Sequence, residues 1–243
     1  MQDPRFMSST QAQAANIDAG LRAYMLGVYN HMTIGMAITG FFAYLTKIMS
    51  VTSEGMLTPF GAAIYTSPLK WLVMLAPLGM VFWLSAKVQT MKPETARNLF
   101  YAFAAIMGIS LSSLLLVFTG ESVIRVFFLT AASFSALSIY GYTTKKNLTS
   151  LGSFLIMGLV GLILASIVNI FLASSAMQFI ISVVGVLIFA GLTAYDTQKI
   201  KNMYVASDSG ELMGKKAVMG ALTLYLDFIN LFIMLLRLFG QRR

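Results

Sequence analysis

Long apolar runs, separated by short polar connections, make up most of the chain. Seven of these runs carry too few charges to form the outer face of a water-soluble helix. About 20 residues are needed to cross the hydrocarbon core of a bilayer as a helix. The pattern therefore predicts an all-α membrane protein, a bundle of about seven transmembrane helices. The expected spans cover residues 24–46, 69–86, 99–118, 123–142, 151–172, 177–195 and 218–240.

The runs follow one another without a soluble insertion, so we expect residues 22–243 to form a single polytopic membrane domain. Residues 1–21 are polar and lack both a basic start and a small-residue cleavage site. They are expected to be a flexible cytoplasmic arm rather than a cleaved signal peptide. Gly161 and Ala165 have the spacing of closely packed membrane helices, a spacing that often arises by chance in Gly-rich membrane chains.

The composition agrees with a membrane protein, because 58% of the residues are hydrophobic and only 11% are charged. A soluble domain usually carries roughly a quarter charged residues. The net charge of +8 comes from basic residues between the apolar runs, which favours contact with lipid headgroups over nucleic-acid binding. The absence of cysteine excludes disulfides, thiolate metal sites and cysteine nucleophiles.

The basic residues also predict an orientation. Nine of them lie in the connections after the second, fourth and sixth runs, against three in the opposite set. The positive-inside rule then places the even-numbered connections and the N-terminus in the cytoplasm. A complete seventh span puts Arg242 and Arg243 on the outer side, against this rule. The last run is nevertheless long enough to span, and we expect seven complete spans.

Asp227 lies near the middle of the last apolar run. Insertion scales put an aspartate at the centre of a helix at roughly +2.5 to +3.5 kcal/mol, so it should face the bundle interior and have a partner. Asn230 shares its helix face. The plain interpretation is a neutral aspartic acid that only holds helices together. We favour a functional site, because buried carboxylates are rare in spans.

Asp196 closes the sixth run, where the plain interpretation is an interfacial carboxylate paired with Lys199. The connection to the seventh run is short, so the two aspartates could approach each other. Two carboxylates at close range cannot both ionise easily, and such a pair would share a proton near physiological pH. Asp227 lies about 14 Å in from Val218, and Asp196 only about 6 Å from Ile200. Contact therefore requires the seventh helix to begin outside the interface or to shift near Gly220.

Arg237 and His31 are two further candidates. Arg237 lies near the far end of the last run, where snorkelling to the headgroups and a gating ion pair are both consistent with its position. His31 is the one histidine, and we expect it to make an interior hydrogen bond, with pH sensing as the alternative.

Two motifs, AYDTQKIK at residues 194–201 and LYLDFINLFIMLLR at residues 224–237, resemble the signature of the Bax-inhibitor family of membrane proteins. The second motif is the more specific, and close resemblance covers about residues 185–240. The resemblance implies six outer helices around a central seventh and a pH-sensitive calcium leak. A bacterial member in the plasma (inner) membrane is expected.

By the same resemblance, Asp196 and Asp227 would form a hydrogen-bonded pair that senses pH beside the pore, with Asn230 and Arg237 in supporting roles. Ca²⁺ would be the transported ion, passing near the two aspartates, and no cofactor is expected. The arginine that matches Arg237 would latch onto an acidic residue of the second helix. The chain departs from this pattern, because residues 71–86 contain no carboxylate.

Other functions have weaker signals. Residues 210–216 are one residue short of P-loop spacing and lack the Ser or Thr after the lysine. An intramembrane aspartyl protease expects Gly-x-Gly-Asp at its second aspartate, where this chain has LYLD at residues 224–227, and a rhomboid-type Gly-x-Ser-Gly is absent. We therefore expect that the protein is not an enzyme. The alternative is a non-transporting regulator that binds other membrane proteins, such as a membrane protease or partners in a death or stress pathway.

Overall fold

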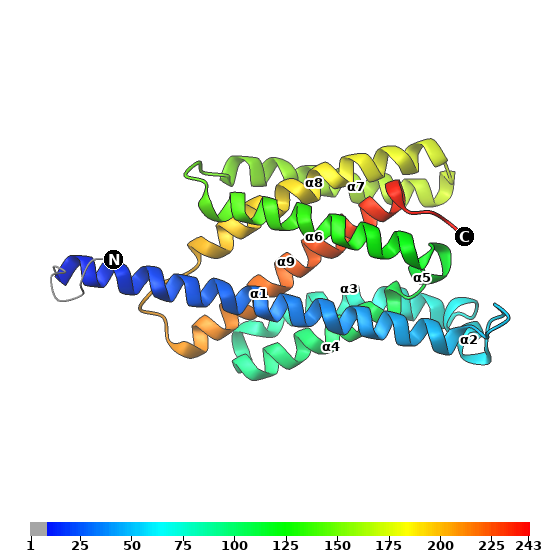
Figure 1. Ribbon diagram of the computed structural model, residues 1–243, viewed down its shortest axis with the longest axis horizontal. Helices are drawn as coiled ribbons and strands as arrows, with labels where there is room; N and C mark the ends of the chain where they lie inside the picture. The colour runs from blue at the N-terminus through cyan, green and yellow to red at the C-terminus, as the bar shows by residue number, and fades with distance from the viewer. Residues whose placement is uncertain (1–8) are drawn as a thin grey trace.

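The computed structural model describes the backbone of residues 9–243 and the side chains from Ile17 onward, and in this range it is helical with no named strand (Figure 1). Seven helices are long and apolar enough to span a membrane, which confirms the predicted fold class. The helices are α1 (Ser9–Ser50), α2 (Pro59–Tyr65), α3 (Leu69–Lys87), η2 (Val88–Thr90), α4 (Pro93–Leu111), α5 (Leu114–Val117), α6 (Gly120–Thr143), α7 (Thr149–Leu172), α8 (Ser175–Asn202) and α9 (Gly210–Phe239).

Several helices extend beyond the apolar runs that predicted them. Helix α1 already begins at Ser9, so residues 9–21 of the expected arm are helical; residues 1–8 lie outside the described residues. Gln and Ala dominate residues 11–15 and favour a helix without being apolar, which explains why the hydrophobic pattern missed this part. Helix α9 begins at Gly210, eight residues before the predicted start at Val218.

The two ends of the bundle carry different connections. The start of α1, the α6–α7 connection and the α8–α9 connection lie at one end, while α2, the α7–α8 turn and the C-terminus lie at the other (Figure 1). Helix α9 therefore runs the full length of the bundle as a seventh span. The tail that follows α9 carries Arg242 and Arg243, and it lies at the end with few other basic residues.

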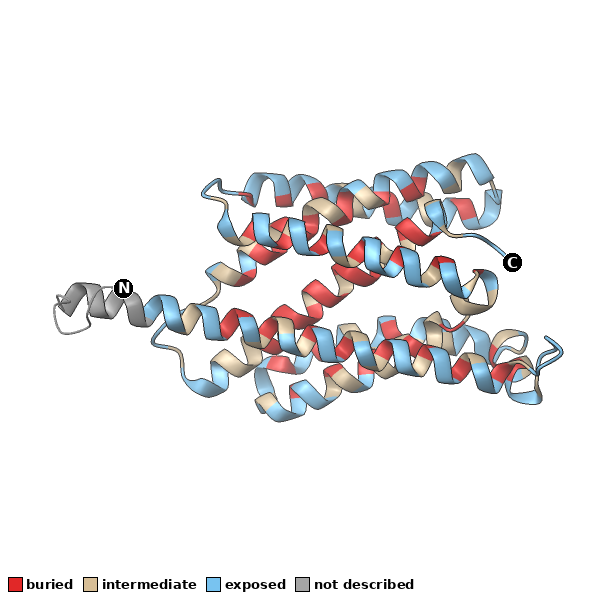
Figure 2. Ribbon diagram, in the orientation of Figure 1, coloured by how far each residue is buried: buried red, intermediate tan, exposed pale blue. Residues whose placement is uncertain are grey.

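Helix α9 is the centre of the bundle. In its most apolar 18-residue stretch 72% of the residues are buried inside the protein, against 17–39% in the other six spans (Figure 2). It contacts α1, α4, α6 and α8, whereas α3 packs on α4 and α7 packs on α8. The expected arrangement of six helices around a seventh is thus present, with α3 and α7 as its outer members.

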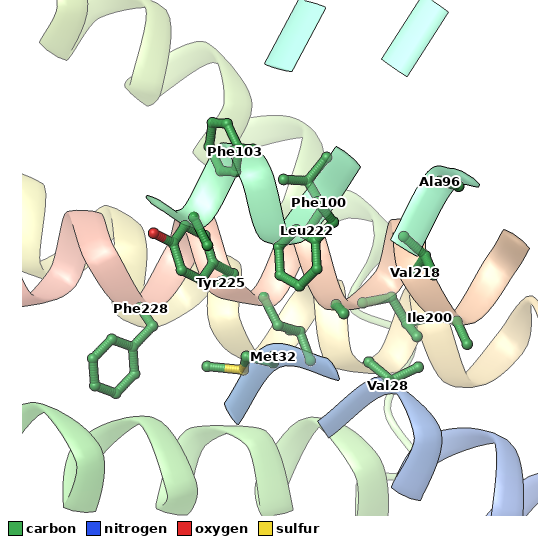
Figure 3. Close-up of a cluster of buried hydrophobic side chains, with 14 of the residues drawn as sticks. Val28, Met32, Ala96, Phe100, Phe103, Ile200, Val218, Leu222, Tyr225 and Phe228 are labelled. Atoms are coloured by element: carbon green, nitrogen blue, oxygen red, sulfur yellow. The ribbon is translucent and has the colours of Figure 1, made fainter. Parts of the chain in front are cut away.

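An aromatic cluster joins α9 to α4 at one side of this centre (Figure 3). Tyr225 is fully buried, and the edges of the rings of Phe100 and Phe103 meet its ring with centroid distances of 5.6 and 5.7 Å. Edge-to-face aromatic pairs are worth about 0.5–1.5 kcal/mol beyond their buried area. The cluster therefore fixes the rotation of α9 against α4.

Glycines allow the closest helix approaches. A Cβ atom at Gly141 of α6 would lie 2.2 Å from the carbonyl oxygen of Ala194 on α8, and a Cβ at Gly220 of α9 would lie 2.9 Å from Ile200 of α8. A Cβ at Gly161 of α7 would meet no neighbouring atom within 4 Å. Gly161 is exposed, so its small-residue spacing with Ala165 does not mark a helix contact.

Replacing two of these glycines by alanine should have opposite effects. Within a helix, Gly→Ala gains about 1 kcal/mol from propensity, so Gly161→Ala should slightly stabilise the protein. At Gly141 the new methyl group would force α6 away from the backbone of α8, which costs about 1–3 kcal/mol. Gly141→Ala should therefore lower the Tm in detergent while Gly161→Ala does not. Equal increases in Tm would contradict the packing of α6 on α8.

Candidate functional site

Asp196 of α8 and Asp227 of α9 lie side by side, because the two helices pack antiparallel in one register. Along this register the Lys216 ammonium meets the carbonyl of Met203, and Gly220 meets Ile200. Further along, the Met234 side chain meets Gly185. The depth mismatch expected from the sequence disappears, because α9 begins outside the apolar run, at Gly210.

The two carboxyl groups are neighbours and are both buried, with 8% of Asp196 and 6% of Asp227 exposed. Carboxylate oxygens only accept hydrogen bonds, so a hydrogen bond between these two groups requires a proton on one of them. Oδ2 of Asp227 has no hydrogen-bond donor among the described residues when both groups are ionised. The geometry allows a protonated acid to pair with a carboxylate.

Lys199 does not form the interfacial ion pair that was the plain interpretation of Asp196. Its side chain is exposed, and its ammonium lies over the ring of Tyr195, 5.9 Å from the centroid. The ion pairs found among the described residues do not include Asp196 or Asp227. Lys199 attracts the charge of both carboxylates through space, without direct contact.

A chain of hydroxyl groups lies beside the pair and connects three helices. Thr197 of α8 donates to the carbonyl of Thr193 at 2.7 Å, so it accepts from Ser138 of α6 at 3.0 Å. The Ser138 hydroxyl in turn accepts from Tyr29 of α1 at 2.6 Å. This assignment follows because each hydroxyl has one proton to give. The chain crosses the gap between α1 and α6 at the level of Asp196.

A second hydroxyl contact lies on the other side of α9. Thr39 of α1 donates to the carbonyl of Gly35 or Ala104, at 3.0 and 2.9 Å. Its oxygen therefore accepts from the hydroxyl of Tyr225, 2.6 Å away. Tyr225 is two residues from Asp227, so this bond and the aromatic cluster hold the backbone next to the pair.

The other candidate residues lie apart from the pair. The Asn230 amide donates to the carbonyl of Leu226, one turn back on α9, at 2.8 Å. Arg237 is exposed and lines a pocket beside the α7–α8 turn, away from α3, so the expected latch has no acidic partner there. Nδ1 of His31 is 2.8 Å from the hydroxyl of Tyr101 on α4, an interior hydrogen bond.

The described residues contain no group of three or more His, Cys, Asp or Glu side chains that could hold a metal ion together. Ca²⁺ takes 6–8 oxygen ligands. At Asp196 and Asp227 such an ion would need most of its ligands from water or hydroxyl groups. This donor set suits a passing ion better than a resident one.

The fold and the site define a seven-span membrane protein whose central helix carries half of a buried carboxyl pair. The chain belongs to the Bax-inhibitor family, since the family model described as inhibitor of apoptosis-promoting Bax1 matches residues 21–243.

Relatives of this chain occur in several bacteria. The inner membrane protein YbhL of Escherichia coli is 43% identical, over 93% of this chain and 94% of its own length. An uncharacterized protein of Caulobacter vibrioides is 46% identical, over 94% of this chain and 92% of its own. The uncharacterized protein RP147 of Rickettsia prowazekii is 43% identical, over 97% of this chain and 96% of its own. The likeness therefore covers nearly whole chains on both sides.

The Tyr225 hydroxyl should contribute about 1 kcal/mol to stability, the usual net value of a neutral hydrogen bond. In Tyr225→Phe the Thr39 hydroxyl keeps its carbonyl acceptors, so no buried donor is left unsatisfied. We expect the free energy of unfolding in detergent to fall by this amount relative to the parent. The matched control is Tyr44→Phe at a side chain that is 60% exposed. Equal stability of the two variants would show that the Thr39 contact contributes nothing.

Proposed function

We propose that the protein is a pH-sensitive leak channel for Ca²⁺, with Asp196 and Asp227 as its proton sensor. The observation that carries this proposal is the contact between two buried carboxyl groups, one of them on the central helix. Buried acids inside a membrane bundle are costly and mark ion or proton pathways. The pair is therefore the place where protonation and helix packing meet.

The charge of the aspartate pair couples protonation to the packing of the helices. With one shared proton it forms a hydrogen bond that holds α8 against α9. Without the proton, two unit charges about 4 Å apart repel by roughly 4 kcal/mol at an effective dielectric constant of about 20. That energy changes an equilibrium between two helix arrangements by about three orders of magnitude. Loss of the proton also leaves two carboxylates to attract a divalent cation.

A passive leak fits better than a pump. The Gly- and Lys-rich stretch at residues 210–216 is the first turns of α9, and its lysines are engaged locally: Lys215 pairs with Glu211 at 2.9 Å, and Lys216 pairs with Asp208 at 2.5 Å. It forms a helix start rather than a phosphate-binding loop. We assign the protein to the bacterial inner membrane, the location in the name of its relative YbhL.

A second function, that of a regulator binding other membrane proteins, is favoured by the family description, which names an inhibitor of a death-promoting protein. Such a regulator would use its lipid-facing or end surfaces and would need no ion path. The two functions differ in one measurable property, the flux of Ca²⁺ through the purified protein.

Calcium flux into proteoliposomes, measured from about pH 5 to pH 8, tests the channel. The parent should show a flux that changes with pH. Asp196→Asn and Asp227→Asn should each flatten this dependence, because an amide cannot exchange the shared proton. The matched control is Glu121→Gln, which removes a carboxylate with an 80% exposed side chain that is paired only with Arg125.

Three outcomes contradict parts of the proposal. A Ca²⁺ flux whose pH dependence survives both aspartate substitutions contradicts the role of Asp196 and Asp227 as the proton sensor. No flux in the parent supports the regulator. Cleavage of a membrane substrate that is lost in both variants would make the protein a protease.

We also propose that the N-terminus lies in the cytoplasm and the C-terminus outside. A green fluorescent protein fused after Arg243 should then be dark, and alkaline phosphatase fused there should be active. The same fluorescent protein at the N-terminus should be bright. A bright C-terminal fusion would reverse the orientation or remove the complete seventh span.

A further inference from the structure

A polar pocket of about 510 Å³ lies where α7, α8 and α9 meet at the C-terminal end of the bundle, apart from the aspartate pair. Its polar lining comes from the end of α7, the start of α8, the end of α9 and the tail that follows it. The polar residues are Asn169, Ser174, Ser175, Gln178, Ser182, Arg237 and Arg242. Acidic side chains are missing from this lining, within the part of the chain that the structure describes.

The tail is held in place so that Arg242 reaches the pocket. Backbone bonds join Thr119 N to Gln241 O at 2.9 Å and Arg243 N to Val117 O at 3.0 Å. The N–H of Gln241 also donates to the Ser122 hydroxyl at 3.2 Å. These bonds fix the backbone on either side of Arg242.

Gly240 is required for this path of the chain. A Cβ there would lie 2.3 Å from the carbonyl oxygen of Leu236 and 2.6 Å from the ring of Phe118. The tail therefore turns tightly against the start of α6 as soon as α9 ends. Two arginines from different segments thus converge on one pocket.

The charges in this pocket are not balanced by the protein. Neither Arg237 nor Arg242 takes part in an ion pair found among the described residues. The start of α8 adds the positive end of a 28-residue helix, with Ser174 as its N-cap. Nε2 of Gln178, one turn into α8, is a buried donor without an acceptor in the described residues. Two arginines and one unpaired donor therefore converge on a lining that contains no acidic side chain among the described residues.

The surroundings of this pocket, at the end of three predicted spans, suit the level of lipid headgroups. Phe171, Phe179 and Phe239 are between 62% and 84% exposed beside it, as expected of side chains that face lipid. Ile170 and Phe179 also line the pocket, so it has an apolar wall next to its basic one. A ligand with an anionic head and an apolar tail matches both walls.

We infer that this pocket is a binding site for a phosphate group, held by Arg237 and Arg242 at the start of α8. The group belongs to an anionic phospholipid headgroup or to a free phosphoanion. Arginine binds phosphate through two parallel N–H donors, and a helix N-terminus favours the same charge. The bound anion also explains how two arginines are accommodated at the end of the bundle that carries few other basic residues. The inference does not depend on calcium transport.

Binding to the purified full chain in a neutral detergent tests the site with two probes. One is inorganic phosphate, followed by calorimetry; the other is phosphatidylglycerol against phosphatidylcholine, counted as retained lipid by native mass spectrometry. The double variant Arg237→Gln, Arg242→Gln should bind the recognised probe at least tenfold more weakly than the parent. The matched control, Arg125→Gln, removes an arginine at the same end that pairs with Glu121 and lies outside the pocket; it should bind like the parent.

The outcomes separate the two sources of phosphate. Retention of phosphatidylglycerol over phosphatidylcholine, lost in the double variant, identifies a lipid headgroup. Binding of inorganic phosphate without lipid selectivity identifies a free anion. The site is overturned if the double variant binds both probes as tightly as the parent does. It is also overturned if Arg125→Gln weakens binding as much as the double variant does. Should the double variant fail to fold, Arg242→Gln alone, in the exposed tail, should weaken binding at least threefold.

Discussion

The antiparallel register of α8 and α9 is the constraint on which the rest of the structure depends. Three contacts set it: Lys216 with the carbonyl of Met203, Ile200 against Gly220, and Met234 against Gly185. Each requires either a glycine or a specific polar partner, so a slip of one residue would break all of them together. The aspartates meet only in this register, and the burial of α9 among four helices holds it there.

Buried hydroxyl groups and buried carboxyl groups in this bundle have different hydrogen-bonding requirements. Buried threonines such as Thr130 and Thr193 donate to the carbonyl one turn back, at 2.8 Å in both cases, so they need no tertiary partner. A carboxylate cannot do this, because it has no proton to give. In a low-dielectric bundle an unpaired charge is far more costly than an unpaired hydroxyl. Asp227 lies beside Asp196 instead, and a hydrogen bond between the two would depend on a shared proton.

Sequence reasoning predicted the seven spans and the burial of Asp227 in the bundle interior, because both follow from the cost of placing polar groups in hydrocarbon. It could not place Asp196 against Asp227, since α9 begins in a stretch with lysines that hydropathy does not count as span. The role of Tyr225 was also missed. A tyrosine in an apolar run is ordinary, and only the three-dimensional packing brings Thr39, Phe100 and Phe103 around it. The places of Asp196 and Tyr225 beside their partners follow from three-dimensional packing, which the hydrophobic pattern of the sequence does not encode.

Helix α9 also connects the two sites physically. Asp227 and Arg237 are ten residues apart on one continuous helix, which corresponds to about 15 Å along its axis. Helices are stiff over such lengths, so a displacement of α9 at the aspartate pair is transmitted to the arginine pocket at its end. The pocket is built partly from α7 and α8, which remain in place relative to each other through their own packing. Loss of the shared proton and release of an anion would therefore act on the same element, the position of α9 against α8.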